Sequence, residues 1–122
     1  MKVYIPLNEL GVNEFDNMVE ESTNNLLIIK FDSTEYFYLE NMKYLDFINV
    51  NCDTLIDLYE EEVIPNEKLK NALEITELLK NNSSDEKYNE LLTRFIDIFK
   101  KAIDAGTFVG VYCYGEEKSF KK

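Results

Sequence analysis

Five carboxylates stand among apolar residues in one short stretch of the chain, DTLIDLYEEEV (residues 53–63). Asp53, Asp57 and Glu61 are spaced four residues apart, which puts them on one face of a helix. Carboxylates in this pattern can act as an acid–base pair, ligate a hard cation such as Ca²⁺, or face a basic partner. The alternative without a function is a solvated helix face.

Catalysis and calcium binding are the less supported of these interpretations. A glycosidase-type pair needs two acids that converge in a cleft, with one pKa raised by burial. The preceding stretch, NVNCD (residues 49–53), lacks the glycine and the position-12 glutamate of an EF-hand loop. A solvated face and a partner-binding surface therefore remain the main alternatives, with carboxylate-only catalysis through Glu60 or Glu61 as a minor one.

Several residue types that enzymes use are scarce. The chain has no histidine, one arginine (Arg94) and four glycines, which form no dinucleotide-binding or Walker A pattern. Its two cysteines, Cys52 and Cys113, have no zinc-site spacing, and we expect reduced thiols, with Cys113 in an apolar strand of the core. These features predict a protein that is not an enzyme and that binds no metal or cofactor.

The acidic residues are concentrated in one quarter of the chain. The net charge is −11, and residues 32–62 carry nine acids against Lys43 alone. Residues 1–31 add a net charge of −3, and residues 63–122 carry ten acids and ten bases. Such an asymmetry favours a basic protein partner and argues against nucleic acid as a partner.

Tyrosines lie within the same acidic quarter, and tyrosine often anchors protein interfaces. If residues 34–40 form a strand with Phe37 and Leu39 facing the helices, then Tyr36, Tyr38 and Glu40 face outward; a shift by one residue would reverse the faces. The alternative is that the tyrosines are half-buried core residues. The predicted partner-binding residues are Asp32, Glu35, Tyr36, Tyr38, Glu40, Asp46, Asp53, Asp57, Glu60, Glu61 and Glu62.

Apolar periodicity and turn residues predict an α+β fold in a single domain, residues 1–122, with a small, antiparallel sheet packed against a group of helices. The expected strands are residues 3–7, 26–31, 34–40 after a hairpin turn at Asp32–Ser33, and 107–114. The expected helices are residues 13–19 capped by Asn13, 41–49, 54–62 capped by Asp53, 66–81, and 85–105 ended by Gly106. Residues 115–122 read as a frayed tail. No signal peptide or membrane span is expected, which predicts a cytoplasmic protein.

The segments LIDLYEEEVIP, IPNEKLKNALEITELLK and YNELLTRFIDIFKKAIDAGTFVGVYCY resemble parts of the small acidic immunity proteins of bacterial polymorphic toxin and contact-dependent growth inhibition systems. The resemblance covers roughly residues 54–114. It implies that the chain, as a monomer or weak dimer, binds a cognate toxin with a basic active site and occludes it without chemistry. A phage nucleic-acid mimic and a non-catalytic adaptor are the alternatives.

Overall fold

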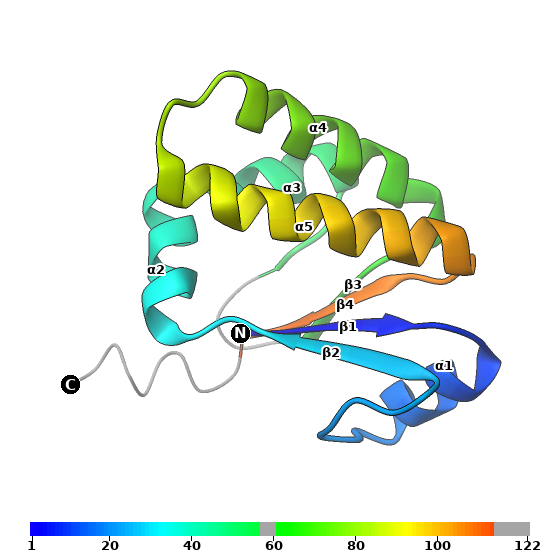
Figure 1. Cartoon of the computed structure of the whole chain (residues 1–122). Coiled ribbons are helices and arrows are strands. Elements are labelled where there is room, and N and C mark those ends of the chain that lie inside the picture. Colours follow the sequence, from blue (N-terminus) through cyan, green and yellow to red (C-terminus); the bar gives the residue numbers. More distant parts are fainter. Residues whose placement is uncertain (57–60, 114–122) are drawn as a thin grey trace.

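The chain forms a sheet with helices on both sides, and the computed structural model describes residues 1–56 and 61–113 (Figure 1). Within these residues four antiparallel strands lie in the order β2-β1-β4-β3. The strands are β1 (Lys2–Pro6), β2 (Leu26–Lys30), β3 (Glu61–Ile64) and β4 (Val109–Tyr112). The helices are α1 (Glu9–Asp16), α2 (Ser33–Asn41), α3 (Tyr44–Cys52), the short 3₁₀ helix η1 (Asn66–Lys68), α4 (Leu69–Asn81) and α5 (Glu86–Ala105). The predicted α+β class is confirmed, and the predicted tail lies outside the described residues.

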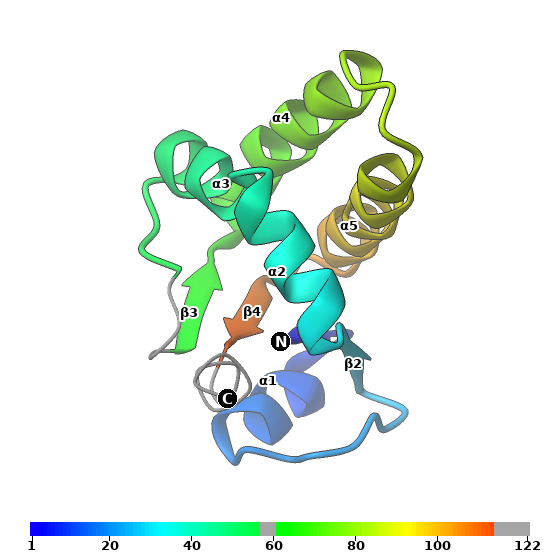
Figure 2. The ribbon, with the colours of Figure 1, turned by 90° about the vertical axis from the view of Figure 1, so that its left-hand side faces the viewer.

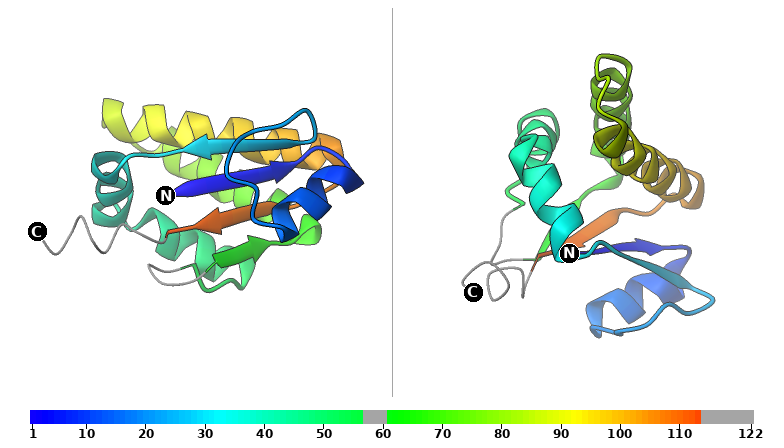
Figure 3. Two further views of the ribbon diagram at one scale, coloured as in Figure 1. Left: turned by 90° about the horizontal axis from the view of Figure 1, so that it is seen from below. Right: turned by 60° about the vertical axis from the view of Figure 1, so that its left-hand side comes forward.

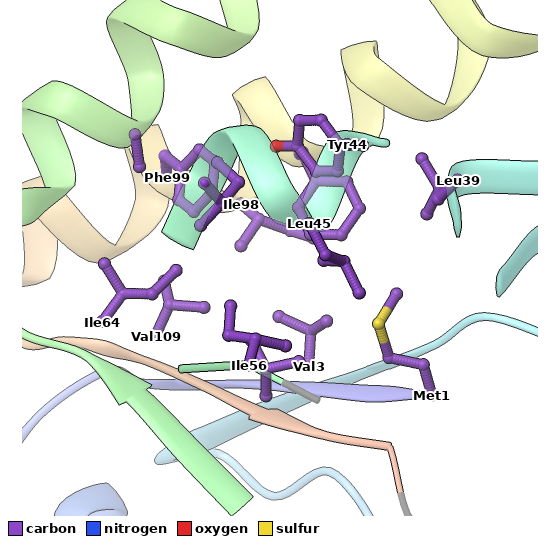
Figure 4. Packing of buried hydrophobic residues seen from close by; sticks show 14 of the residues in the cluster. Met1, Val3, Leu39, Tyr44, Leu45, Ile56, Ile64, Ile98, Phe99 and Val109 are labelled. Carbon is purple, nitrogen blue, oxygen red and sulfur yellow. The ribbon is translucent and has the colours of Figure 1, made fainter. Parts of the chain in front are cut away.

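The sheet separates two apolar clusters. Helices α3, α4 and α5 lie over one face, α1 lies on the other, and α2 stands at one end (Figure 1). Because neighbouring strand residues point to opposite faces, Val3 enters the larger core under α2–α5, whereas Tyr4 packs with Phe15 and Leu26 beside α1. Figure 4 shows Phe99 in the larger core, between the helices and the sheet.

The two long helices agree with the prediction. Residues 66–81 form η1 and α4, and residues 86–105 form α5. Asp85 caps α5 by accepting a hydrogen bond from the Tyr88 N–H at 2.9 Å, and Gly106 ends the helix in the left-handed region, at φ 70°. Cys113 lies in the core, as predicted.

The first helix begins earlier than predicted. The capping residue is Asn8 and not Asn13, because the Asn8 side chain accepts a hydrogen bond from the Gly11 N–H at 3.0 Å. This cap places α1 at residues 9–16 instead of 13–19 and brings Phe15 onto the sheet.

The predicted strand at residues 34–40 and the hairpin at Asp32–Ser33 are wrong, since this segment is helix α2. The reason is local: Asp32 accepts a hydrogen bond from the Glu35 N–H at 2.8 Å, and Glu35 accepts one from the Asp32 N–H at 2.9 Å. This reciprocal capping box starts a helix and outweighs the β-propensity of the aromatic residues that follow.

The predicted helix at residues 54–62 is wrong where the structure describes it. Helix α3 starts at Tyr44, three residues later than predicted, and Asp53 ends it in the left-handed region at φ 55° instead of starting a new helix. The Asn49 side chain then binds both backbone groups of Ile56, by accepting from its N–H and donating to its carbonyl, and residues 54–56 are not helical. Strand β3 follows, paired with β4, while Asp57, Tyr59 and Glu60 lie outside the described residues.

Candidate protein-interaction surface

The predicted acidic residues that the structure describes lie on three segments of the chain. They belong to α2 and the residue that caps it, to α3 and the residue after it, and to the start of β3, and Figure 2 shows these elements with α2 in front. Their roles differ, because some carboxylates are committed to hydrogen bonds within the chain and others are exposed.

Asp32 and Glu35 stabilise the fold. Besides their capping box, the Glu35 carboxylate forms an ion pair with Arg94 at 2.8 Å, and only 18% of the Glu35 side chain is exposed. Arg94 also lies over the Phe31 ring, 4.0 Å from its centroid, and donates to the Lys30 carbonyl. The one arginine of the chain therefore joins α5 to α2 and β2, and Glu35 is not available to a partner.

The predicted outward strip of Tyr36 and Tyr38 is also wrong. Tyr36 is 1% exposed in the helical core. The half-buried Tyr38 donates its hydroxyl to the Asp85 carboxylate, 2.7 and 2.6 Å from the two oxygens. The interpretation of these tyrosines as core residues is therefore the one that the structure supports.

The bond between Tyr38 and Asp85 predicts a dependence of stability on pH. The Tyr38 hydroxyl and the Tyr88 N–H hold the pKa of Asp85 below its ordinary value of about 4. The ionised carboxylate therefore stabilises the folded state above pH 4, and this contribution is lost as the pH falls through the folded-state pKa. We expect the free energy of unfolding of Tyr38→Phe to fall less steeply below pH 4 than that of the wild type, as measured by urea titrations at several pH values. The same dependence on pH below pH 4 in both proteins would contradict this role of the Tyr38 hydroxyl.

Three acids near α3 are exposed. Glu40 lies in the last turn of α2, Asp46 lies in the first turn of α3, and Asp53 follows the last residue of α3. Partial burial raises the pKa of Glu40, and the neighbouring Asp46 raises it further, against an opposing effect of Lys43. The charges of Glu40 and Asp46 therefore interact between the end of α2 and the first turn of α3.

Large apolar side chains are exposed beside these acids. Phe47, Val50 and Leu55 are 40%, 82% and 76% exposed. Helical spacing explains the arrangement: α3 buries Leu45, Ile48 and Cys52, which leaves positions 46, 47 and 50 on its outer side. We call Asp46, Phe47, Val50, Asp53 and Leu55 the α3 surface. Sequence reasoning missed the apolar part of this surface, because the predicted helices at residues 41–49 and 54–62 left Val50 between them and put Leu55 inside the second. Correct bounds for α3 would have revealed positions 47 and 50.

The two acids of β3 have separate roles. Glu62 accepts hydrogen bonds from the Leu55 N–H at 2.8 Å and the Val63 N–H at 3.2 Å, so that it ties the segment after α3 to the sheet. Glu61 is exposed and lies near Tyr4, whose pKa is raised first by burial and then by the Glu61 charge. Only Glu61 of this pair is therefore available to a partner.

The described carboxylates are not arranged for metal chemistry. Across residues 1–56 and 61–113, no three histidine, cysteine, aspartate or glutamate side chains come together in a way that could hold a metal ion. In the same part of the chain, no helix has the length and apolar character needed to cross a membrane. Burial raises the pKa of the Cys52 thiol, which lowers its reactivity.

Comparison with known proteins finds no significant match to the chain among protein-family models, curated proteins or solved structures.

Proposed function

We propose that this chain is an immunity protein that binds and neutralises a bacterial toxin, and that the α3 surface is the centre of the contact. The observation that carries the proposal is the combination on one short helix and its following turn of three exposed large apolar side chains with two exposed aspartates. Exposed apolar residues rimmed by charged ones are typical of protein-binding sites. Phe47, Val50 and Leu55 would be the apolar anchors, in place of Tyr36 and Tyr38.

The charge of the chain supports a basic partner. With a net charge of −11, the protein attracts a positively charged surface over long range and raises the rate of encounter. A toxin that cuts nucleic acid needs a basic active site, because its substrate is a polyanion. The immunity protein would cover this site sterically and electrostatically, in the cytoplasm, as a monomer or weak dimer and without catalysis.

The nucleic-acid mimic is the less supported alternative. A mimic of DNA or RNA would expose acids in a row with the spacing of phosphates. In the α3 surface the two acids are separated by Phe47 and Val50, and Leu55 follows them; Glu35 and Glu62 are committed to internal hydrogen bonds. Apolar anchors of this size favour a protein interface over a purely electrostatic one.

The test is binding of the protein encoded by the adjacent upstream gene to a chain with Asp46→Lys and Asp53→Lys. We expect the association rate to fall by about 10- to 100-fold at low salt, because both charges face the basic partner. The matched control is Glu90→Lys with Asp104→Lys, two exposed acids of α5. Both pairs change the net charge from −11 to −7, since two changes from acid to lysine add four charges.

Two results would contradict the proposal. Equal effects of the α3 pair and the α5 pair would mean that only the net charge matters and that the α3 surface is not the contact. Failure of the wild-type chain to bind the neighbouring gene product or to protect cells that express it would remove the immunity function.

A further inference from the structure

The outer edge of strand β2 is closed by the chain itself. At Leu26, the carbonyl accepts from the Thr23 N–H at 2.9 Å and the N–H donates to the Thr23 hydroxyl at 3.1 Å. At Ile28, the Ser22 hydroxyl accepts from the N–H and donates to the carbonyl. The Lys30 carbonyl accepts from Arg94. These bonds use the groups that another strand would need in order to pair with β2.

The pattern of hydrogen bonds across the sheet shows which groups of β3 face outward. The Phe31 N–H donates to the Met1 carbonyl, and the Leu7 N–H donates to the Asn25 carbonyl, so that the odd residues of β1 bond to β2. Its even residues then bond to β4, and the alternate residues of β4 bond to β3. By this alternation Glu62 and Ile64 bond to β4, whereas Glu61 and Val63 direct their N–H and carbonyl groups to the outer edge.

Among residues 1–56 and 61–113, few groups pair with the outer edge of β3. Within the described part of the chain, the Glu62 carboxylate is the one partner at this edge, through its bond of 3.2 Å to the Val63 N–H. The carbonyls of Glu61 and Val63 and the Glu61 N–H have no such partner among residues 1–56 and 61–113. A strand edge of this kind is a ready template for pairing with an added strand.

An apolar groove borders the same strand on the α1 side. Leu7, Val12, Val63, Pro65 and Phe108 contribute to its lining, and its volume is about 560 Å³. Figure 3, left, views the sheet from this side and shows β3 at the margin, beyond α1. Since alternate side chains of an added strand point to one face, one or two of them would enter this groove.

We propose that the outer edge of β3 binds an extended basic segment of the partner protein as a fifth strand of the sheet, with alternate apolar side chains in the groove beside Val63. Strand β3 has no basic residue and exposes Glu61, and the net charge of the chain is −11, which together favour lysines or arginines in the added strand. A second copy of the chain is the less favourable occupant, because it would bring Glu61 near its own equivalent and carry the same net charge. The identity of the partner as a toxin rests on the proposed function; the strand-binding site does not.

The probe is a capped heptapeptide that alternates lysine and valine, titrated into the isotope-labelled full chain. We expect slowed hydrogen exchange at the Glu61 and Val63 amides, with smaller changes along β2. The same peptide with N-methyl groups on alternate amides keeps its charge and side chains but loses the hydrogen-bonding edge, and we expect it to bind at least tenfold more weakly. Equal binding of the two peptides, or no binding at millimolar concentration, would overturn the proposal.

Val63→Pro tests the β3 edge by a change in the protein instead of the peptide. Because the Val63 N–H is directed away from β4, proline at this position leaves the pairing of β3 with β4 intact and blocks an added strand. We expect peptide binding to fall at least tenfold, with a smaller effect of the control Val63→Ala, which keeps the N–H. Should Val63→Pro fail to fold, the comparison of the two peptides on the wild-type chain decides the question. A wild-type dimer that Val63→Pro dissociates would also overturn the proposal.

The same variants separate this inference from the proposed function. A toxin that binds the wild-type chain and Val63→Pro equally well overturns strand addition and leaves the immunity function standing. Addition of the peptide to β3 in a chain that binds no toxin supports the strand site and removes the immunity function.

Discussion

The Gly11→Ala variant is expected to lose about 3 kcal/mol of its free energy of unfolding. A β-carbon built on Gly11 would stand 1.9 Å from the carbonyl oxygen of Asn25 and 3.2 Å from the Cα of Pro6, both backbone atoms that cannot rotate away. The Asn25 carbonyl also accepts the Leu7 N–H at 2.8 Å, where β1 leaves its pairing with β2. Helix α1 can therefore dock on the sheet only if residue 11 has no side chain.

The measurement is urea unfolding followed by circular dichroism, which gives the free energy of unfolding directly. In thermal unfolding the same 3 kcal/mol corresponds to a fall in the melting temperature of about 10 °C. The result is diagnostic because alanine would otherwise stabilise a helix interior by about 1 kcal/mol relative to glycine. Asn13→Ala, at an exposed position of the same helix, is the control and should change stability by less than about 0.5 kcal/mol. A Gly11→Ala chain as stable as the wild type would show that α1 does not lie against the Asn25 backbone.

The elements that the sequence predicted well are those whose signals are local and mutually consistent. In α5 an apolar stripe, a capping aspartate and a terminal glycine all indicate the same helix. In α2 the local signals conflict: Tyr36, Phe37 and Tyr38 favour a strand, whereas Asp32 and Glu35 form a capping box. The capping box was visible in the sequence, and greater weight on it would have predicted the helix.

The end of the acidic stretch, which was predicted as helix and forms strand β3, depends on contacts that are distant in sequence. Strand β3 exists because β4, almost fifty residues later, offers it an edge, and no local pattern in Glu61–Ile64 reveals that pairing. The candidate site shows the same limit. Charge counting found the acidic half of the α3 surface, but only the fold reveals that Arg94 binds Glu35 and that Glu62 holds the Leu55 N–H.

The apolar half of the α3 surface leads to the largest expected effect on binding. In the proposed complex, the Phe47→Ala, Val50→Ala double variant should dissociate from the toxin about 100-fold faster than the wild type, or about 2.7 kcal/mol. Truncated anchors near the centre of an interface act mainly on the dissociation rate, whereas loss of Asp46 and Asp53 acts on association. The two kinds of variant should therefore change different rate constants of the same complex.

Exposure of both side chains makes this test practicable. Because Phe47 is 40% and Val50 82% exposed, we expect the double variant to lose only about 1 kcal/mol of stability and to stay folded. Leu10→Ala with Ile103→Ala, at exposed positions of α1 and α5, removes apolar surface elsewhere and should leave the dissociation rate unchanged. If both double variants dissociate at the wild-type rate, while the aspartate variants still slow association, then α3 would guide the encounter without forming the contact. The open edge of β3 would then be the first surface to examine, since strand addition relies on backbone groups that no side-chain truncation removes.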